Sequence, residues 1–216
     1  MNIVTVGPEG TLAHEATKKT FPQGHIFFGP SISEVFFLLS GKIIQRACVP
    51  LISTQNGFFE ETVTNLLKFD FSFRKKIKQK VSYSLCGWAP PEKAEILFAH
   101  PNVYAECEKN IHKICPKARL IKTASSANTA LQLKAKKDSN HLALLSSFAI
   151  DYYDLPLLKE GVEDKSDQGI TFYVLAKTPS SPSKHAQTAF LIFSDKILSA
   201  ENQIRNLIKE HSAKIL

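Results

Sequence analysis

Short apolar segments rich in β-branched residues alternate with helix-like segments along most of this chain of 216 residues. Over the first third, the strand-like and helix-like segments in turn are residues 2–6, 11–21, 25–29, 31–40, 46–51 and 58–68. Strands that are connected through helices usually pair in parallel, with the helices packed on the faces of the sheet. The alternation therefore predicts an α/β fold with mainly parallel sheets.

The alternation continues in the second half of the chain. Its strand-like segments are residues 80–88, 95–101, 119–124, 141–147 and 169–177, and its helix-like segments are residues 102–115, 125–137 and 147–154. Proline and serine then become frequent, so we expect a linker over residues 179–185. A last strand and helix are predicted within residues 186–216, and this short β-α piece is too small to fold alone.

The opening stretch VTVGPEGTLAHEA, residues 4–16, places a glycine-rich turn between a buried strand and a helix. Thr11 is a suitable N-cap for that helix, and His14 falls in its first turn. Backbone N–H groups at such a turn and at the start of a helix bind small anions. We therefore expect a small, negatively charged ligand near this turn.

Composition is ordinary for a soluble globular protein, with 44% hydrophobic and 22% charged residues. No apolar run approaches the roughly 20 residues of a membrane span, and Met1-Asn2-Ile3 lacks the basic start of a signal peptide. The cysteine spacings fit neither zinc nor thioredoxin motifs, so we expect no metal and interpret the cysteines as reduced thiols of a cytoplasmic protein. The four cysteines are Cys48, Cys86, Cys107 and Cys115.

The net charge of +7 is compatible with a nucleic acid, a membrane surface or an acidic metabolite as partner. The densest basic run, RKKIKQK at residues 74–80, lacks interleaved aromatic residues and matches no nucleic-acid module. We predict that this run is a solvated surface. We expect neither a nucleic acid nor a membrane as partner.

Five segments, taken in order, resemble one family, the prephenate dehydratases. They match its Gly-Pro-Glu-Gly-Thr turn, its Val-Pro segment with Glu-Asn-Ser, its Ser-His-Pro segment with a downstream Gln-Cys, its Ser-Thr-Ala segment, and its last motif, where Thr-Arg-Phe precedes a strand. The segments are VGPEGTLAHEA (6–16), VPLISTQNGFFEETVTNLL (49–67), AHPNVYAEC (99–107), ASSANTA (124–130) and VEDKSDQGITFYVL (162–175).

The resemblance implies a two-lobed domain over residues 1–178, similar to the periplasmic binding proteins, with the site in the cleft between the lobes. One lobe would hold residues 1–79 and 158–178, and the other residues 80–157. Residues 186–216 resemble only the first strand and helix of the family's phenylalanine-sensing ACT domain, so we do not predict phenylalanine feedback. Family members are usually dimers or tetramers, so we expect a homodimer.

The resemblance also implies a reaction. Members of the family convert prephenate to phenylpyruvate by expelling water and carbon dioxide together, as carbon–oxygen lyases in phenylalanine biosynthesis. The reaction needs holders for the carboxylates and a donor that helps hydroxide to leave. Because aromatisation drives it, we expect no cofactor and a small-molecule carboxylate, prephenate or an aromatic acid, as ligand.

Candidate site residues follow from the matching positions. For catalysis we expect Thr171, Ser126 and His14. For substrate binding we expect Pro8, Glu9, Gly10, Thr11, Ser53, Thr54, Gly57, Ser125 and Phe172. The glycines could equally be plain structural turns, His100 could be a hydrogen-bonded core histidine, and Cys107 is expected to be a packing residue.

Two motifs depart from the family pattern. The family's Thr-Arg-Phe aligns with Ile170-Thr171-Phe172, and its Glu-Asn-Ser aligns with Ile52-Ser53-Thr54. The usual candidate acid and the arginine that grips a carboxylate are therefore replaced. A slip of one residue would bring Thr171 to the threonine position but would turn each side chain of the strand to the opposite face. His14, Lys165, Gln168 and Thr171 are candidates to compensate.

Three functions remain open on the sequence. The first is an enzyme acting on prephenate, either a dehydratase or a relative that removes only carbon dioxide and leaves the ring non-aromatic. The second is a catalytically inactive small-molecule binding or sensing protein, because Ile52 and Ile170 make the cleft more apolar. The third is a nucleic-acid binder, which rests on the net charge alone.

Overall fold

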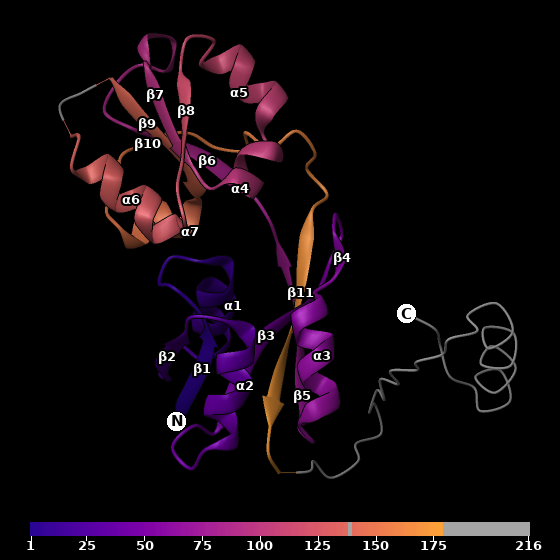
Figure 1. The fold of residues 1–216 in the computed structure, drawn as a ribbon. Coiled ribbons are helices and arrows are strands. Elements are labelled where there is room, and N and C mark those ends of the chain that lie inside the picture. Colours follow the sequence, from indigo (N-terminus) through magenta and orange to yellow (C-terminus); the bar gives the residue numbers. More distant parts are fainter. Residues whose placement is uncertain (138–139, 179–216) are drawn as a thin grey trace, which may run out of the picture. The chain divides into compact units, whose positions relative to one another are not determined.

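Two β-sheets organise the residues that the structure describes, 1–137 and 140–178, in a computed structural model (Figure 1). The first sheet contains β1 (Asn2–Val6), β2 (His25–Gly29), β3 (Arg46–Ser53), β4 (Gly57–Phe58), β5 (Ser72–Lys80) and β11 (Gly169–Ala176). The second contains β6 (Tyr83–Gly87), β7 (Ile96–Ala99), β8 (Arg119–Lys122), β9 (His141–Ser146) and β10 (Leu157–Lys159). The expected linker and ACT-like piece lie outside the described residues.

Helices cover both sheets. They are α1 (Leu12–Thr20), α2 (Ile32–Ser40), α3 (Glu60–Lys68), the 3-10 helix η1 (Pro91–Lys93), α4 (Pro101–Ala105), α5 (Glu108–Ile114), α6 (Ser126–Lys134) and α7 (Ser147–Tyr152). We call the first sheet with α1, α2 and α3 the first lobe, and the second sheet with α4 to α7 the second lobe. The expected α/β fold with two lobes is confirmed.

The two sheets are mixed rather than mainly parallel, which corrects the expectation from the sequence. The first has the order β2-β1-β3-β11-β5, with β4 beside β3. Its β1, β2 and β3 pair in parallel, whereas β11 is antiparallel to both β3 and β5. The second has the order β10-β6-β9-β7-β8, in which β7 is parallel to its neighbours and β6 antiparallel. Antiparallel pairing enters where the chain leaves and re-enters the first lobe.

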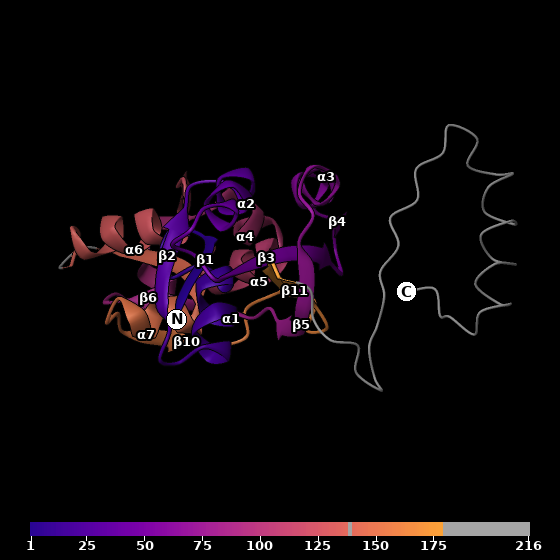
Figure 2. The same ribbon diagram turned by 90° about the horizontal axis from the view of Figure 1, so that it is seen from below.

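The core of the first lobe lies on both faces of its sheet, because side chains alternate along a strand. Along β3, Ala47 and Val49 pack with α2, while Cys48 packs with α1 and Phe172. Figure 2 shows α1 and α2 on opposite sides of β1. Because α1 follows β1, its start lies near the carboxyl end of β1, at the side of the sheet that borders the cleft described below.

The second lobe is built in the same way. Its sheet packs against α5 on one face through Ile111 and against α6 and α7 on the other through Leu133 and Ile150. A connecting segment, residues 160–168, then leads back to the first lobe. Its Asp164 carboxylate accepts hydrogen bonds from the N–H groups of Lys109 (3.1 Å) and Asn110 (2.9 Å), which ties the segment to the first turn of α5.

Two of the predicted segments differ in structure from their prediction, and the short elements β4, β10 and η1 were not predicted. The basic run forms β5, a strand at the edge of the first sheet that pairs with β11, and its side chains range from half-buried to exposed. The single helix expected over residues 102–115 is divided into α4 and α5 at Glu106 and Cys107, where Cys107 has φ −125° and ψ 0°. This break determines where the Glu106 side chain lies.

Candidate functional site

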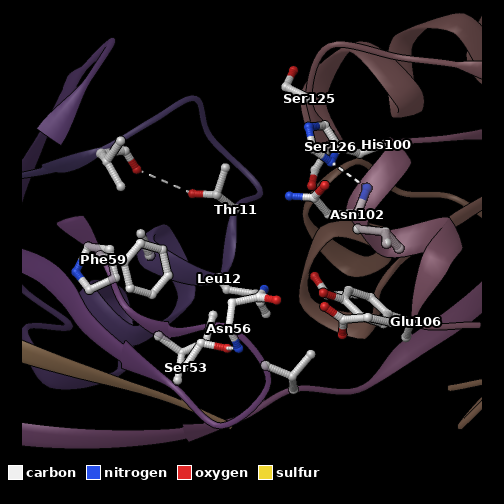
Figure 3. Close-up of a pocket in the computed structure, with 18 of the residues that line it drawn as sticks. Thr11, Leu12, Ser53, Asn56, Phe59, His100, Asn102, Glu106, Ser125 and Ser126 are labelled. Atoms are coloured by element: carbon white, nitrogen blue, oxygen red, sulfur yellow. Dashed lines mark hydrogen bonds between the residues drawn. The ribbon is translucent and has the colours of Figure 1, made fainter. Parts of the chain in front are cut away.

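A cleft of about 490 Å³ lies between the two lobes. Figure 3 shows Thr11, Leu12, Ser53, Asn56 and Phe59 of the first lobe facing His100, Asn102, Glu106, Ser125 and Ser126 of the second. The other lining residues include Pro8, Tyr83, Ser146, Gln168, Gly169, Ile170 and Phe172. A cleft of this size is typical of a site for a small organic molecule.

The opening turn contributes only some of its predicted residues to the cleft. Pro8 and Thr11 line it, and Thr11 caps α1 by accepting a hydrogen bond from the N–H of His14 at 3.2 Å. Glu9 and Gly10 instead contact the end of α7, where the Tyr153 hydroxyl donates to the carbonyl oxygen of Glu9 at 3.1 Å. Gly10 has φ +77°, and a Cβ there would lie 2.6 Å from the Tyr153 ring, so this position requires glycine.

His14 lies beside the cleft rather than among its lining residues. Its side chain is only 5% exposed, and its Nδ1 accepts a hydrogen bond from the N–H of Gly10 at 3.1 Å. The rings of Phe28, Phe148 and Tyr152 meet it edge-on at about 5 Å. Burial lowers the pKa of His14 below its usual 6.5, against a smaller raising effect of Glu9. His14 therefore holds the opening turn against α7 as a neutral ring.

We expect this contact to make stability depend on pH. The unfolded chain protonates His14 near 6.5, whereas the folded chain resists protonation until a lower pH. The folded state thus binds fewer protons, and the free energy of unfolding should fall as the pH drops below 6.5. Urea denaturation at pH 7.5 and 5.5 measures this fall. The fall in the free energy of unfolding should be smaller in His14→Asn than in the unchanged chain. It should persist in His112→Asn, where an exposed histidine is changed. Equal falls in both variants would contradict the assignment of the pH dependence to His14.

The predicted residues of the Val-Pro segment, 49–67, do not all lie at the cleft. Ser53 lines the cleft, and its hydroxyl accepts hydrogen bonds from the N–H groups of Gln55 (3.2 Å) and Asn56 (3.4 Å). Thr54 lies in a second hollow, and its hydroxyl accepts from the N–H of Gly169 at 3.0 Å. Gly57 is exposed at φ +72° and lines neither. The structure thus brings only Ser53 of these three into the cleft.

Polar groups of the second lobe gather at the starts of two helices. Ser125 caps α6 by accepting from the N–H of Asn128 at 3.1 Å, and Ser126 begins that helix with its side chain at the cleft. His100 caps α4 in the same way, since its Nδ1 accepts from the N–H of Asn102 at 3.3 Å. The first turn of a helix carries partial positive charge, so both helix starts favour an anion in the cleft.

The last motif places alternate residues on different sides of β11. Ile170 and Phe172 line the cleft, and Phe172 is almost fully buried, with 1% of its surface exposed. Thr171 lines the second hollow, with Thr54, Lys78 and Asp167, and is absent from the residues that line the cleft. Gln168, Gly169 and Ile170 line both, whereas Phe172 lines only the cleft. The alternation follows from the side-chain period of two in a strand.

Glu106 supplies the only acidic side chain among the described residues that line the cleft. Burial raises the pKa of its carboxyl, the charge of Glu163 raises it further, and a hydrogen bond with Tyr83 lowers it. The adjacent Cys107 is buried, and burial raises the pKa of its thiol, so the thiol stays neutral and unreactive at neutral pH. The expectation of a packing role for Cys107 agrees with its place in the core of the second lobe.

Charge and metal ligands limit what the cleft can hold. Among its lining residues that the structure describes, none is lysine or arginine. Over the same described part of the chain, no three His, Cys, Asp or Glu residues are grouped so as to hold a metal ion. Among the described helices of the whole chain, none is long and apolar enough to cross a membrane. An anion in this cleft would therefore rely on helix starts and hydroxyl groups.

The fold and the cleft together define a two-lobed α/β protein with a cleft of about 490 Å³ between its lobes. The sequence model of one family, described as prephenate dehydratase, matches residues 3–180. The chain belongs to the prephenate dehydratase family, as the five motifs indicated.

Curated relatives agree with this assignment, and a solved structure shares the fold. The bifunctional chorismate mutase/prephenate dehydratase of Pseudomonas aeruginosa is 23% identical over 89% of this chain and 53% of its own length. The prephenate dehydratase of Lactococcus lactis is 23% identical over 84% of this chain and 65% of its own. This chain thus spans between half and two-thirds of each relative. The structure of an Arthrobacter aurescens prephenate dehydratase in complex with L-Phe aligns with a TM-score of 0.76 at 15% identity, over 85% of this chain and 63% of that one, which shows the shared fold.

Several cleft residues were not predicted from the sequence. Asn56, Tyr83, Asn102, Glu106 and Ser146 all line the cleft without having been proposed. A signal for Glu106 was available, because it precedes Cys107 at the position where the family pattern has glutamine. Asn56 and Asn102 lie within two of the segments that match the family. Tyr83 and Ser146 lie outside all five segments and become visible only when the two lobes are placed together.

Proposed function

We propose that the chain is a carbon–oxygen lyase of the prephenate dehydratase type, which converts prephenate to phenylpyruvate with loss of water and carbon dioxide. One observation carries the proposal. Residues from all five segments that match the family pattern, distant from one another in the sequence, line one cleft. Thr11, Ser53, His100, Ser125 and Ile170 represent the five.

The helix starts on the two sides of the cleft suit the two carboxylates of the substrate. Thr11 and Pro8 lie at the start of α1, and Ser125 and Ser126 lie at the start of α6. Each start favours a carboxylate through its partial positive charge and its free N–H groups. The Ser126 hydroxyl adds a donor on the second lobe. We propose these groups as the substrate frame.

A binding or sensing protein without turnover is the second candidate. It is favoured by the absence of lysine and arginine from the described cleft residues and by Ile170 at the position of the family's threonine. Such a cleft suits an aromatic acid or amino acid with fewer negative charges than prephenate.

A homodimer and a cytoplasmic location remain predictions from the sequence.

The test is to incubate the purified chain with prephenate at neutral pH and follow the products by absorbance and mass. Phenylpyruvate formed well above the rate without protein supports the dehydratase. A decarboxylated, non-aromatic product would instead identify a prephenate decarboxylase. No turnover, combined with a rise in melting temperature on adding an aromatic acid or amino acid, would identify a binding protein, because a ligand of the native state stabilises it.

A further inference from the structure

Glu106 ends α4 at the break before α5, and its side chain reaches the cleft. Figure 3 shows its carboxyl group facing Leu12 and Asn56 across the cleft. The Tyr83 hydroxyl interacts with this carboxyl, and Tyr83 is only 6% exposed. Its Oε2 is buried and has no hydrogen-bond partner in the protein. A buried carboxyl oxygen without a partner is costly unless a ligand or a proton occupies it.

On balance the surroundings of Glu106 favour its protonated form, because burial and the charge of Glu163 outweigh the opposing effect of the Tyr83 hydroxyl. The titratable groups that act on its carboxyl are Tyr83 of β6 and Glu163 of the connecting segment. Cys107 is the next residue, and Asp164 acts on the Cys107 thiol. Glu163 is held in place because it accepts hydrogen bonds from the Tyr83 N–H at 3.0 Å and from Ser82. None of these groups is a cation that would stabilise a carboxylate. Burial and the neighbouring negative charge therefore raise the pKa of Glu106.

The proposed reaction needs a proton donor that the last motif does not supply. Hydroxide is a poor leaving group, and an acid that protonates it in the transition state accelerates its departure. The family's threonine is replaced by Ile170, which has no proton to donate. Ile170 lines the same cleft as Glu106, and it packs against the hydrophobic cluster that contains Tyr83, the partner of Glu106.

We propose that the Glu106 carboxyl is the catalytic acid of this chain, in place of the hydroxyl that Ile170 lacks. This inference rests on the proposed function. The C–O bond of the ring hydroxyl breaks, and the leaving oxygen takes the proton of Glu106 to become water. The C–C bond to the ring carboxylate breaks at the same time, carbon dioxide leaves, and its electron pair completes the aromatic ring. Glu106 remains as a carboxylate, and solvent returns its proton before the next turnover.

Glu106→Gln tests the proposal, because glutamine preserves the size and the interaction with Tyr83 but cannot act as an acid. Phenylpyruvate formation is measured against pH, with the rate without protein subtracted. In the unchanged chain, kcat should fall as the pH rises through the pKa of Glu106. In Glu106→Gln, kcat should be lower by about 10²–10⁴-fold, KM should change little, and the fall with rising pH should disappear.

Two further variants separate an acid from a positioning residue. Glu106→Ala leaves room beside Tyr83, and added acetic acid should restore part of its rate, with less rescue as the pH rises. Glu108→Gln removes an exposed carboxylate two residues away and should leave kcat and its pH profile unchanged. Rescue by the acid form of a small carboxylic acid does not follow from a structural role.

The outcomes distinguish a failure of the role of Glu106 from a failure of the proposed dehydratase function. Phenylpyruvate formation with the same kcat and pH profile in Glu106→Gln, or a loss that acetic acid does not rescue in Glu106→Ala, would overturn the role of Glu106 and leave the proposed function standing. No phenylpyruvate from the unchanged chain at any pH would overturn the proposed function, and the role of Glu106 with it.

Discussion

Replacing Phe172 with alanine is expected to lower the free energy of unfolding by about 3–5 kcal/mol. Phe172 is 1% exposed and packs against Ala13, Ala16 and Cys48, where α1 meets the first sheet. The larger, partly buried Val6, Leu12, Ile77 and Ile170 pack against the same cluster. Because packed side chains relax only partly around a missing ring, the cost includes a cavity as well as lost burial. Urea denaturation followed by circular dichroism measures the change.

Phe37→Ala is the matched control for this prediction. Phe37 lies on α2 with 64% of its surface exposed, so the same substitution should change stability by only about 0.5 kcal/mol or less. Phe172 was also predicted as a substrate-binding residue and lines the cleft. A Phe172→Ala variant that keeps its stability but loses its response to prephenate would contradict the core role and favour the binding role.

Ile170→Thr is expected to restore a hydroxyl at the position of the family's threonine. In the Glu106→Gln background it should raise kcat for phenylpyruvate formation by about 10²–10³-fold, the usual value of one donor at a reacting centre. The gain should be smaller when Glu106 is present, because either group could then protonate the leaving oxygen. The measurement is kcat in all four combinations of the two positions.

Ile170→Val separates the hydroxyl from the change in volume. Valine has nearly the shape of threonine and stays branched at Cβ, but it cannot donate a proton. Both substitutions remove a methyl group from a side chain that packs against the clusters of both lobes, so they share the packing cost. If threonine raised kcat no more than valine, the hydroxyl would have no role in the reaction.

Much of the fold follows from local patterns. The strands β1, β2, β3, β7, β9 and β11 and the helices α1, α2, α6 and α7 begin and end within a few residues of the segments predicted from periodicity and capping residues. The strand β5 was missed because its lysines and arginine resemble a solvated surface, whereas pairing with β11 determines its structure. Tertiary pairing commonly outweighs the low β-propensity of lysine.

The site is harder to predict, because it combines side chains from two lobes. Ser53, Ser125 and Thr11 were found through motifs, and each lies at the cleft. Which of Ile170 and Thr171 faces the cleft depends on the register of β11 against β3, where Ile170 pairs with Ser53 and Thr171 with Ile52. Sequence alone gives the alternation of these side chains but not the side that the second lobe covers.

The order of strands in the first sheet has a consequence for synthesis of the chain. β11 lies between β3 and β5, although it is the last strand of this sheet to be made. All strands of the second sheet lie between residues 83 and 159, so they leave the ribosome before β11 does. Domains generally fold as units while the chain emerges, and long-range pairing forms late. The sheet of the first lobe therefore stays incomplete until β11 is made. By then, all strands of the second lobe have been synthesised and can pair with one another.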